Sequence, residues 1–136
     1  MAVSDWTSKL NADPEPVVRR MAVARAGVKK GGTMLLPSAR VVDDAIRGIP
    51  KGKSLTLLEL RTKLARQYKA DGCCPVYLGY RLRTVAEAAC EARNRGLPES
   101  SVTPIWRVLN DRTPTLKKLS AANAAWITER RSREKL

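Results

Sequence analysis

The segment from Val76 to Arg95 constrains the fold more than any other part of the chain. Apolar residues recur in it at helical spacing, which predicts one long helix with a single buried face. These residues are Leu78, Leu82, Val85, Ala89 and Ala92. Pro75 can occupy the first turn of this helix, and Gly96 ends it. The other elements must therefore pack around this helix.

A second helix is predicted directly before the long one. Thr56 and Glu59 form a capping box, in which a hydroxyl and a carboxylate three residues apart satisfy backbone N–H groups. The apolar face of this helix holds Leu57, Leu60, Leu64 and Tyr68. Asp71 and Gly72 form the turn to the long helix. Two helices joined by a turn, the second carrying arginines, are a common device for reading DNA.

Shorter elements flank this helix pair. Ser38 can cap a helix over residues 39–48, and Ser120 can cap a last helix. The segment Pro104–Leu109 is rich in β-branched and aromatic residues, which predicts an extended conformation before a turn at Asn110–Pro114. This order predicts a mainly α fold, a winged helix-turn-helix DNA-binding domain with a short β wing, over residues 37–136.

Residues 1–36 are predicted to form a basic N-terminal arm that is partly ordered. A short helix is expected from Asp5 to about Leu10, and residues 17–28 are compatible with a second helix. That second segment carries Arg19, Arg20 and Arg25, and a basic turn follows it at residues 29–32. The arm either packs against the body or follows DNA phosphates.

The net charge narrows the class of partner. The chain has 26 Lys and Arg residues against 13 acidic ones, a net charge of +13. This excess predicts affinity for a polyanion, which is DNA, RNA or an acidic membrane surface. We find no signal peptide and no apolar run long enough to span a bilayer. We therefore expect a cytoplasmic, nucleoid-associated protein without a membrane partner.

The absence of histidine excludes several kinds of active site. It removes Ser-His-Asp and Cys-His arrangements and most zinc sites. Cys73 and Cys74 precede a helix that can lower a thiol pKa, but we expect both of them and Cys90 to be buried, inert thiols. The sequence thus predicts no catalytic residue, no metal and no cofactor.

The residues from about Ser38 to Arg133 resemble the DNA-binding domain of the O6-alkylguanine-DNA alkyltransferases and their alkyltransferase-like relatives. The family pattern Ile-Pro-x-Gly matches Ile49–Gly52, and its hydrophobic-Thr-Tyr step matches residues 55–57. The family's recognition helix opens Arg-Ala-Val-Gly-x-Ala-Met, and this chain has Arg-Thr-Val-Ala-Glu-Ala-Ala over residues 83–89. The family's active-site stretch, Ile/Val-Pro-Cys-His-Arg-Val, is matched by Thr-Pro-Ile-Trp-Arg-Val over residues 103–108.

The resemblance implies a binder without the family's chemistry. Ile105 occupies the position of the nucleophilic cysteine, Trp106 that of the histidine, and Leu57 that of the tyrosine. Without thiolate and base, alkyl transfer by the family mechanism is not possible. The resemblance makes Arg83 the arginine finger that takes the space of an extruded nucleotide. From the pattern alone, Arg83 can instead pair with Glu87 one helical turn on.

We therefore expect a monomeric, non-enzymatic protein of alkyltransferase-like type. Its expected partners are double-stranded DNA, with O6-alkylguanine as the candidate lesion, and repair proteins. It would recognise alkylated or distorted bases by minor-groove binding and base flipping. The expected DNA contacts are Arg83, Ala86, Ala88, Arg81, Thr84, Arg61, Arg66 and Thr56. The expected base pocket consists of Ile105, Trp106, Arg107, Pro104 and Leu57.

Two alternatives stay open at this point. The first is an active methylated-DNA–protein cysteine methyltransferase that uses a displaced cysteine. The second is a winged-helix regulator or an RNA-binding adaptor that does not recognise lesions.

Overall fold

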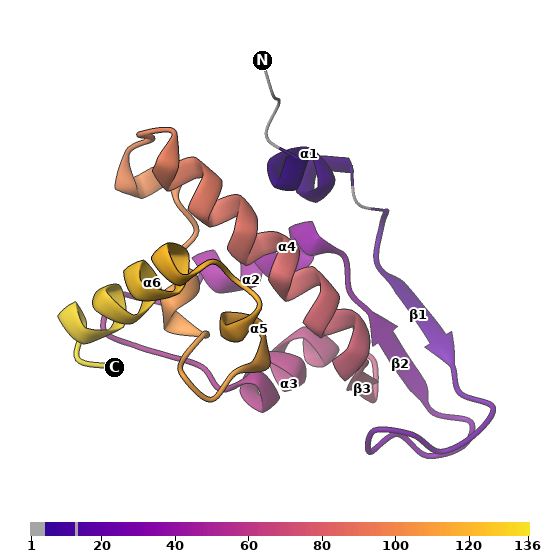
Figure 1. Ribbon diagram of the computed structural model, residues 1–136. Helices are drawn as coiled ribbons and strands as arrows, with labels where there is room; N and C mark the ends of the chain where they lie inside the picture. The colour runs from indigo at the N-terminus through magenta and orange to yellow at the C-terminus, as the bar shows by residue number, and fades with distance from the viewer. Residues whose placement is uncertain (1–4, 13) are drawn as a thin grey trace.

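The protein is mainly helical, with a small sheet at one side (Figure 1). The computed structural model describes residues 5–12 and 14–136. The α-helices are α1 (Asp5–Ala12), α2 (Ala39–Arg47), α3 (Leu57–Gln67), α4 (Pro75–Asn94), α5 (Pro114–Lys117) and α6 (Ala121–Arg133). The strands are β1 (Val17–Arg20), β2 (Thr33–Leu36) and β3 (Gly72–Cys73). Two 3-10 helices follow α4, namely η1 (Glu99–Ser101) and η2 (Ile105–Arg107).

The helix α4 lies at the centre of the molecule and packs against α1 and α2 (Figure 1). Its predicted apolar face is confirmed, because Leu78, Leu82, Val85 and Ala89 are buried in the main core. The predicted caps are also confirmed. The Ser38 hydroxyl accepts a hydrogen bond from Val41 N, and Thr56 and Glu59 form both bonds of the capping box.

The sheet is formed by residues that the sequence pattern did not mark as strands. The strand order is β1-β2-β3, with β1 antiparallel and β3 parallel to β2. The expected helix over residues 17–28 is therefore wrong. Residues 17–20 pair instead with residues 33–36, where Met34 and Leu35 are buried on opposite faces of the strand. The helix was predicted wrongly because β2, the strand that pairs with residues 17–20, lies beyond a twelve-residue loop over residues 21–32. A local pattern does not reveal such a partner.

The expected extended segment over Pro104–Leu109 is also wrong. Residues 105–107 form the 3-10 helix η2, and residues 95–120, all of them described, contain no strand. Ile105, Trp106, Val108 and Leu109 are all buried. A tight turn allows consecutive bulky side chains to enter the core together, whereas a strand would send alternate ones to opposite faces.

The N-terminal segment packs onto the rest of the chain. The strand β2 pairs with β3, and α1 lies across α4 (Figure 1). The predicted boundary between residues 36 and 37 stays a prediction, and residues 1–4 and 13 of the predicted arm lie outside the described residues. The described helices include none with the length and apolar character needed to cross a bilayer.

Candidate nucleic-acid interface

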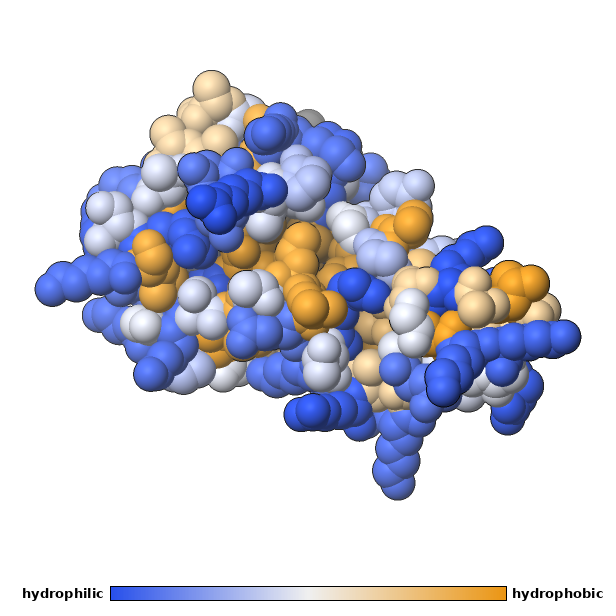
Figure 2. Space-filling view, turned by 90° about the horizontal axis from the view of Figure 1, so that it is seen from below, coloured by the Kyte–Doolittle hydropathy of each residue, from blue (hydrophilic) through white to orange (hydrophobic). Residues whose placement is uncertain are grey.

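A basic hairpin projects from the helical body. It consists of β1, β2 and the connecting loop over residues 21–32 (Figure 1). All four residues of β1 are exposed, including Arg19 and Arg20. Arg25, Lys29 and Lys30 in the loop are exposed as well. Only one acidic residue, Glu15, lies between residues 14 and 36. The hairpin is therefore a strongly positive ribbon. Figure 2 shows long hydrophilic side chains projecting beside apolar ones at its right, the side on which the hairpin lies in Figure 1.

The conformation of this hairpin is fixed by bonds inside its loop. Met21 N donates to Gly32 O at 2.8 Å, and Gly31 N donates to Met21 O at 2.8 Å. The Arg20 guanidinium donates to Gly31 O at 2.6 Å. Val28 and Met34 pack against Cys74 at the start of α4. The hairpin and the first turn of α4 are thus neighbours.

The first half of α4 presents apolar and aromatic side chains to solvent. Val76, Tyr77 and Tyr80 are exposed, Tyr80 to 63%. Arg81 lies 5.6 Å from the centre of the Tyr77 ring, and its Nε donates to Pro37 O at 3.2 Å. The two tyrosines are not among the DNA contacts predicted from the sequence. Their exposure could have been predicted from the sequence, because both tyrosines lie off the buried apolar stripe of the helix.

The second half of α4 is covered by α1. Trp6 N and Thr7 N both donate to the Glu91 carboxylate, at 3.4 and 3.0 Å. The Arg83 guanidinium lies 5.3 Å from the centre of the Trp6 ring, and Glu87 is 3.6 Å from Arg83 Nε. Arg83 therefore makes the predicted ion pair with Glu87 and also stacks on a residue of α1.

The other predicted DNA contacts occupy different environments. Ala86 and Ala88 on α4 are buried, Ala86 completely.

The predicted polar contacts also differ in exposure. Arg61 Nε donates to Cys73 O at 3.1 Å and joins α3 to β3, whereas Arg66 is exposed. Thr84 donates to Tyr80 O, and Thr56 caps α3. Arg66 is thus the predicted phosphate contact most open to solvent on α3.

The residues predicted for a base pocket are divided between the core and a cleft. Ile105 is completely buried, and Leu57 packs half-buried against the same core. Pro104, Trp106 and Arg107 line a cleft of about 360 Å³. The remaining lining residues are Arg47, Lys51, Glu99, Ser100, Val102, Arg130 and Glu134.

The Trp106 side chain is held in place by contacts on several sides. Its Nε1 donates to Glu134 at 2.7 Å. The guanidinium groups of Arg107 and Arg130 lie 5.6 and 4.4 Å from its ring centre. Trp126 meets it edge-on, with 5.6 Å between the ring centres. Since Trp106 is only 2% exposed, a base cannot stack on this indole unless Arg130 moves.

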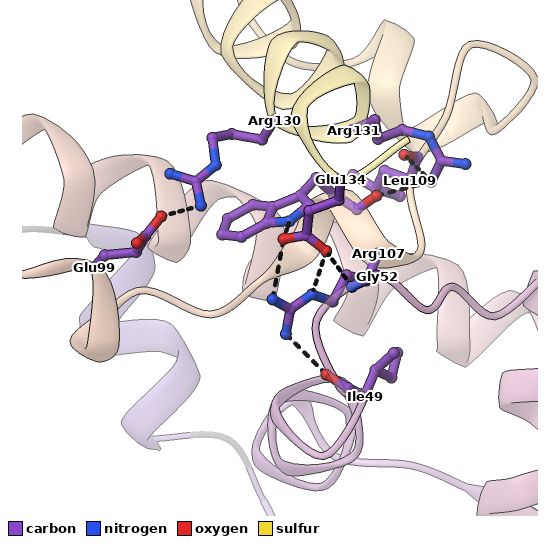
Figure 3. Close-up of polar contacts among 9 residues, drawn as sticks. Ile49, Gly52, Glu99, Arg107, Leu109, Arg130, Arg131 and Glu134 are labelled. Carbon is purple, nitrogen blue, oxygen red and sulfur yellow. Dashed lines mark hydrogen bonds and ion pairs between the residues drawn. The ribbon is translucent and has the colours of Figure 1, made fainter. Parts of the chain in front are cut away.

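Figure 3 shows the polar contacts around Glu134. Arg107 donates to its carboxylate from Nε and Nη2, and Gly52 N donates to it at 2.9 Å. The hydrogen bonds from Arg107 are the main reason that the pKa of Glu134 falls to about 2. Arg130 pairs with Glu99 across the cleft. Burial, helped by the charge of Arg133, lowers the pKa of Arg130.

The cysteines are unfavourably placed for nucleophilic chemistry. Cys73, Cys74 and Cys90 are all buried, as free thiols. Burial raises the pKa of Cys73 to about 11 and that of Cys90 to about 12. A thiol that stays protonated at neutral pH is a poor nucleophile. Within the described part of the chain, no three His, Cys, Asp or Glu side chains gather into a possible metal site.

Comparisons with protein-family profiles, curated proteins and solved structures give no match to this chain.

Proposed function

We propose that this protein is a non-enzymatic DNA-binding protein of alkyltransferase-like type. It holds duplex DNA with α3 and α4, as a winged helix-turn-helix domain, and with the β1–β2 hairpin. The observation that carries this proposal is the hairpin itself, a projecting ribbon with five basic side chains and all of β1 exposed.

The physical basis of the proposal is electrostatic. A two-stranded ribbon fits a DNA groove, and cations along it replace the counterions of the phosphates. Arg19 and Arg20 lie on the strand, and the three loop cations extend the positive surface away from the body. The net charge of +13 adds a long-range attraction toward DNA.

The open end of α4 supports the same proposal. In helix-turn-helix proteins the first residues of the second helix face the base edges. Here Val76, Tyr77 and Tyr80 are exposed in that region, and the first turn holds no acidic residue. The helix dipole and free N–H groups of that turn also favour an approaching phosphate.

Recognition of an alkylated base is a second candidate function, favoured by the cleft beside Pro104, Trp106 and Arg107. Its volume of about 360 Å³ is within the range of ligand pockets. Base binding would require Arg130 to leave the Trp106 ring, and an arginine finger would require Arg83 to leave Trp6.

The test is a fluorescence anisotropy assay with duplex DNA, the matched duplex containing one O6-methylguanine, single-stranded DNA and RNA. The hairpin variant Arg19→Gln/Arg20→Gln should weaken duplex binding about tenfold near 100 mM salt. The control variant Arg133→Gln/Lys135→Gln removes two charges at the C-terminal end, which lies away from the hairpin in Figure 1. It should change the affinity less than about threefold. Equal losses in the two variants would overturn the assignment of the hairpin.

The probes also separate the alternatives. A preference of about tenfold for the methylated duplex would support lesion recognition. Tighter binding to RNA than to duplex would favour an RNA-binding adaptor. Transfer of a labelled methyl group from the DNA to a cysteine would instead identify a methyltransferase.

A further inference from the structure

We propose that the cleft between η1 and α6 binds a phosphate group. Arg130 and Lys51 would contact its oxygens, and Glu99 would leave when it binds. The cleft is distinct from the hairpin, because Glu99 and Ser100 of η1 and Arg130 of α6 line it, and α6 lies away from β1 (Figure 1).

The lining of the cleft carries more positive than negative charge. Its cations are Arg47, Lys51, Arg107 and Arg130, and its anions are Glu99 and Glu134. Glu134 is neutralised by Arg107, and Arg47 pairs with Asp43 outside the cleft at 2.9 Å. Two lining cations, Arg130 and Lys51, are then left with one lining anion, Glu99, to balance them. An excess positive charge in a concave, partly buried site attracts an anion.

The two partners of the Arg130–Glu99 ion pair differ in how firmly they are held. The Arg130 side chain is 17% exposed and stacks on the Trp106 ring, 4.4 Å from its centre. The Glu99 side chain is 65% exposed and comes from a three-residue 3-10 turn. Exposed partners of this kind add little to stability and are readily replaced. Figure 3 shows Glu99 reaching toward Arg130 from the opposite wall.

Arg130 also keeps unused hydrogen-bonding capacity. Its Nε is buried and has no hydrogen-bond partner among the described residues. The structure likewise gives Lys51 no ion pair within the described part of the chain. An external anion beside Arg130 could therefore take the Lys51 ammonium as a second partner, whereas the ion pair of Glu99 among the described residues is with Arg130.

Phosphate fits this cleft better than a base or a simple carboxylate. Its several oxygens carry more charge and can contact a guanidinium and an ammonium together. The exposed Ser100 at the rim can donate a further hydrogen bond. A base would need a free face of the Trp106 indole, and both guanidinium groups lie over that ring.

The test uses the full chain and isothermal titration calorimetry with inorganic phosphate. Glu99→Gln removes the competing carboxylate and should tighten phosphate binding about fivefold. Glu129→Gln is the matched control, because it removes another exposed carboxylate, one that does not line the cleft and is paired with Arg133. The control should change the affinity less than about twofold. If the two variants behave alike, the cleft is not the phosphate site.

A second pair of variants tests the cation. Arg130→Gln should weaken phosphate binding about tenfold, whereas Arg133→Gln on the same helix should leave it nearly unchanged. If both variants weaken phosphate binding equally, the loss comes from the lower net charge of the protein and not from a contact in the cleft. That result would overturn the proposal. Should Arg130→Gln fail to fold, the two glutamate variants still decide the question.

The source of the phosphate is distinguished by a third comparison. A trinucleotide with a 5′-phosphate is compared with inorganic phosphate and with the same trinucleotide carrying a 5′-hydroxyl, using wild type and Glu99→Gln. Equal affinity for the two trinucleotides would overturn the phosphate site. Tighter binding of the phosphorylated trinucleotide than of inorganic phosphate supports a nucleic-acid end as ligand. Equal affinity for the phosphorylated trinucleotide and for inorganic phosphate supports a site for free phosphate esters. Duplex binding can fail in the hairpin assay without affecting either result.

Discussion

The guanidinium of Arg107 donates two hydrogen bonds to the carboxylate of Glu134, one from Nε and one from Nη2, each 3.0 Å long. The same guanidinium donates to Ile49 O at 2.8 Å. Glu134 lies just beyond α6, so this pair ties the C-terminal helix to η2 and to the end of α2. The Glu134 side chain is only 3% exposed, which makes the pair a structural element of the cleft.

Glu134→Gln should lower the free energy of unfolding by about 2 kcal/mol at pH 7, because it leaves the partly buried Arg107 without its counter-charge. Urea unfolding followed by tryptophan fluorescence measures this change. Glu129→Gln, which breaks an exposed pair, should cost less than about 0.5 kcal/mol. Similar losses of unfolding free energy in the two variants would show that the buried Arg107–Glu134 pair stabilises the fold no more than an exposed pair does.

The same carboxylate should make the protein sensitive to acid. Its pKa is about 2 in the folded protein against an ordinary value of 4.5, so folding favours the ionised form. The stabilisation is complete above the ordinary value and is lost as the pH falls from about 4.5 toward 2. The urea midpoint of the wild type should therefore drop across this window, and that of Glu134→Gln should drop less. If the urea midpoints of the two proteins fall in parallel with pH, Glu134 is not the group responsible for the acid sensitivity.

Trp6→Ala should strengthen duplex binding about two- to fivefold, because it releases Arg83 from the stacking contact that holds it on α1. The gain should vanish when Arg83→Ala is added. Ser8→Ala, at an exposed position of the same helix, is the control. Unchanged or weaker binding by Trp6→Ala would contradict the prediction that the Trp6 stack holds Arg83 away from DNA.

The thiols should react slowly in the folded protein. Burial raises the pKa of Cys73 and Cys90 far above neutral, and Cys74 is buried as well. Reaction with an aromatic disulfide at pH 8 should be on the order of a hundredfold slower than in urea. One fast-reacting cysteine in the folded protein would reopen the methyltransferase alternative.

The sequence predicted α2, α3, α4 and α6, because the signals of these helices are local. The Thr56–Glu59 capping box, the Ser38 cap and the apolar stripe of α4 each involve residues within a few turns of one another. The sheet was missed because β1 finds its partner across a long loop. Residues 105–107 were missed because a continuous apolar run does not distinguish a strand from a buried tight turn.

The candidate site was predictable only in part. The basic hairpin residues were identified through their charge, although their conformation was not. Glu134 and Glu99 were not selected, because their partners, Trp106 and Arg130, are distant from them in sequence and become neighbours only through folding. The stacking of Trp6 on Arg83 was equally invisible, since no local pattern links α1 to α4.

The salt dependence of duplex binding by the wild-type protein tests directly whether the hairpin holds DNA. If the five cations of the hairpin contact phosphates, the logarithm of the association constant should fall against the logarithm of salt concentration with a slope of about −4.5. The Arg19→Gln/Arg20→Gln variant should reduce that slope by about two. Absence of duplex binding at about 50 mM salt, or an affinity that does not change with salt, would contradict DNA binding by the hairpin.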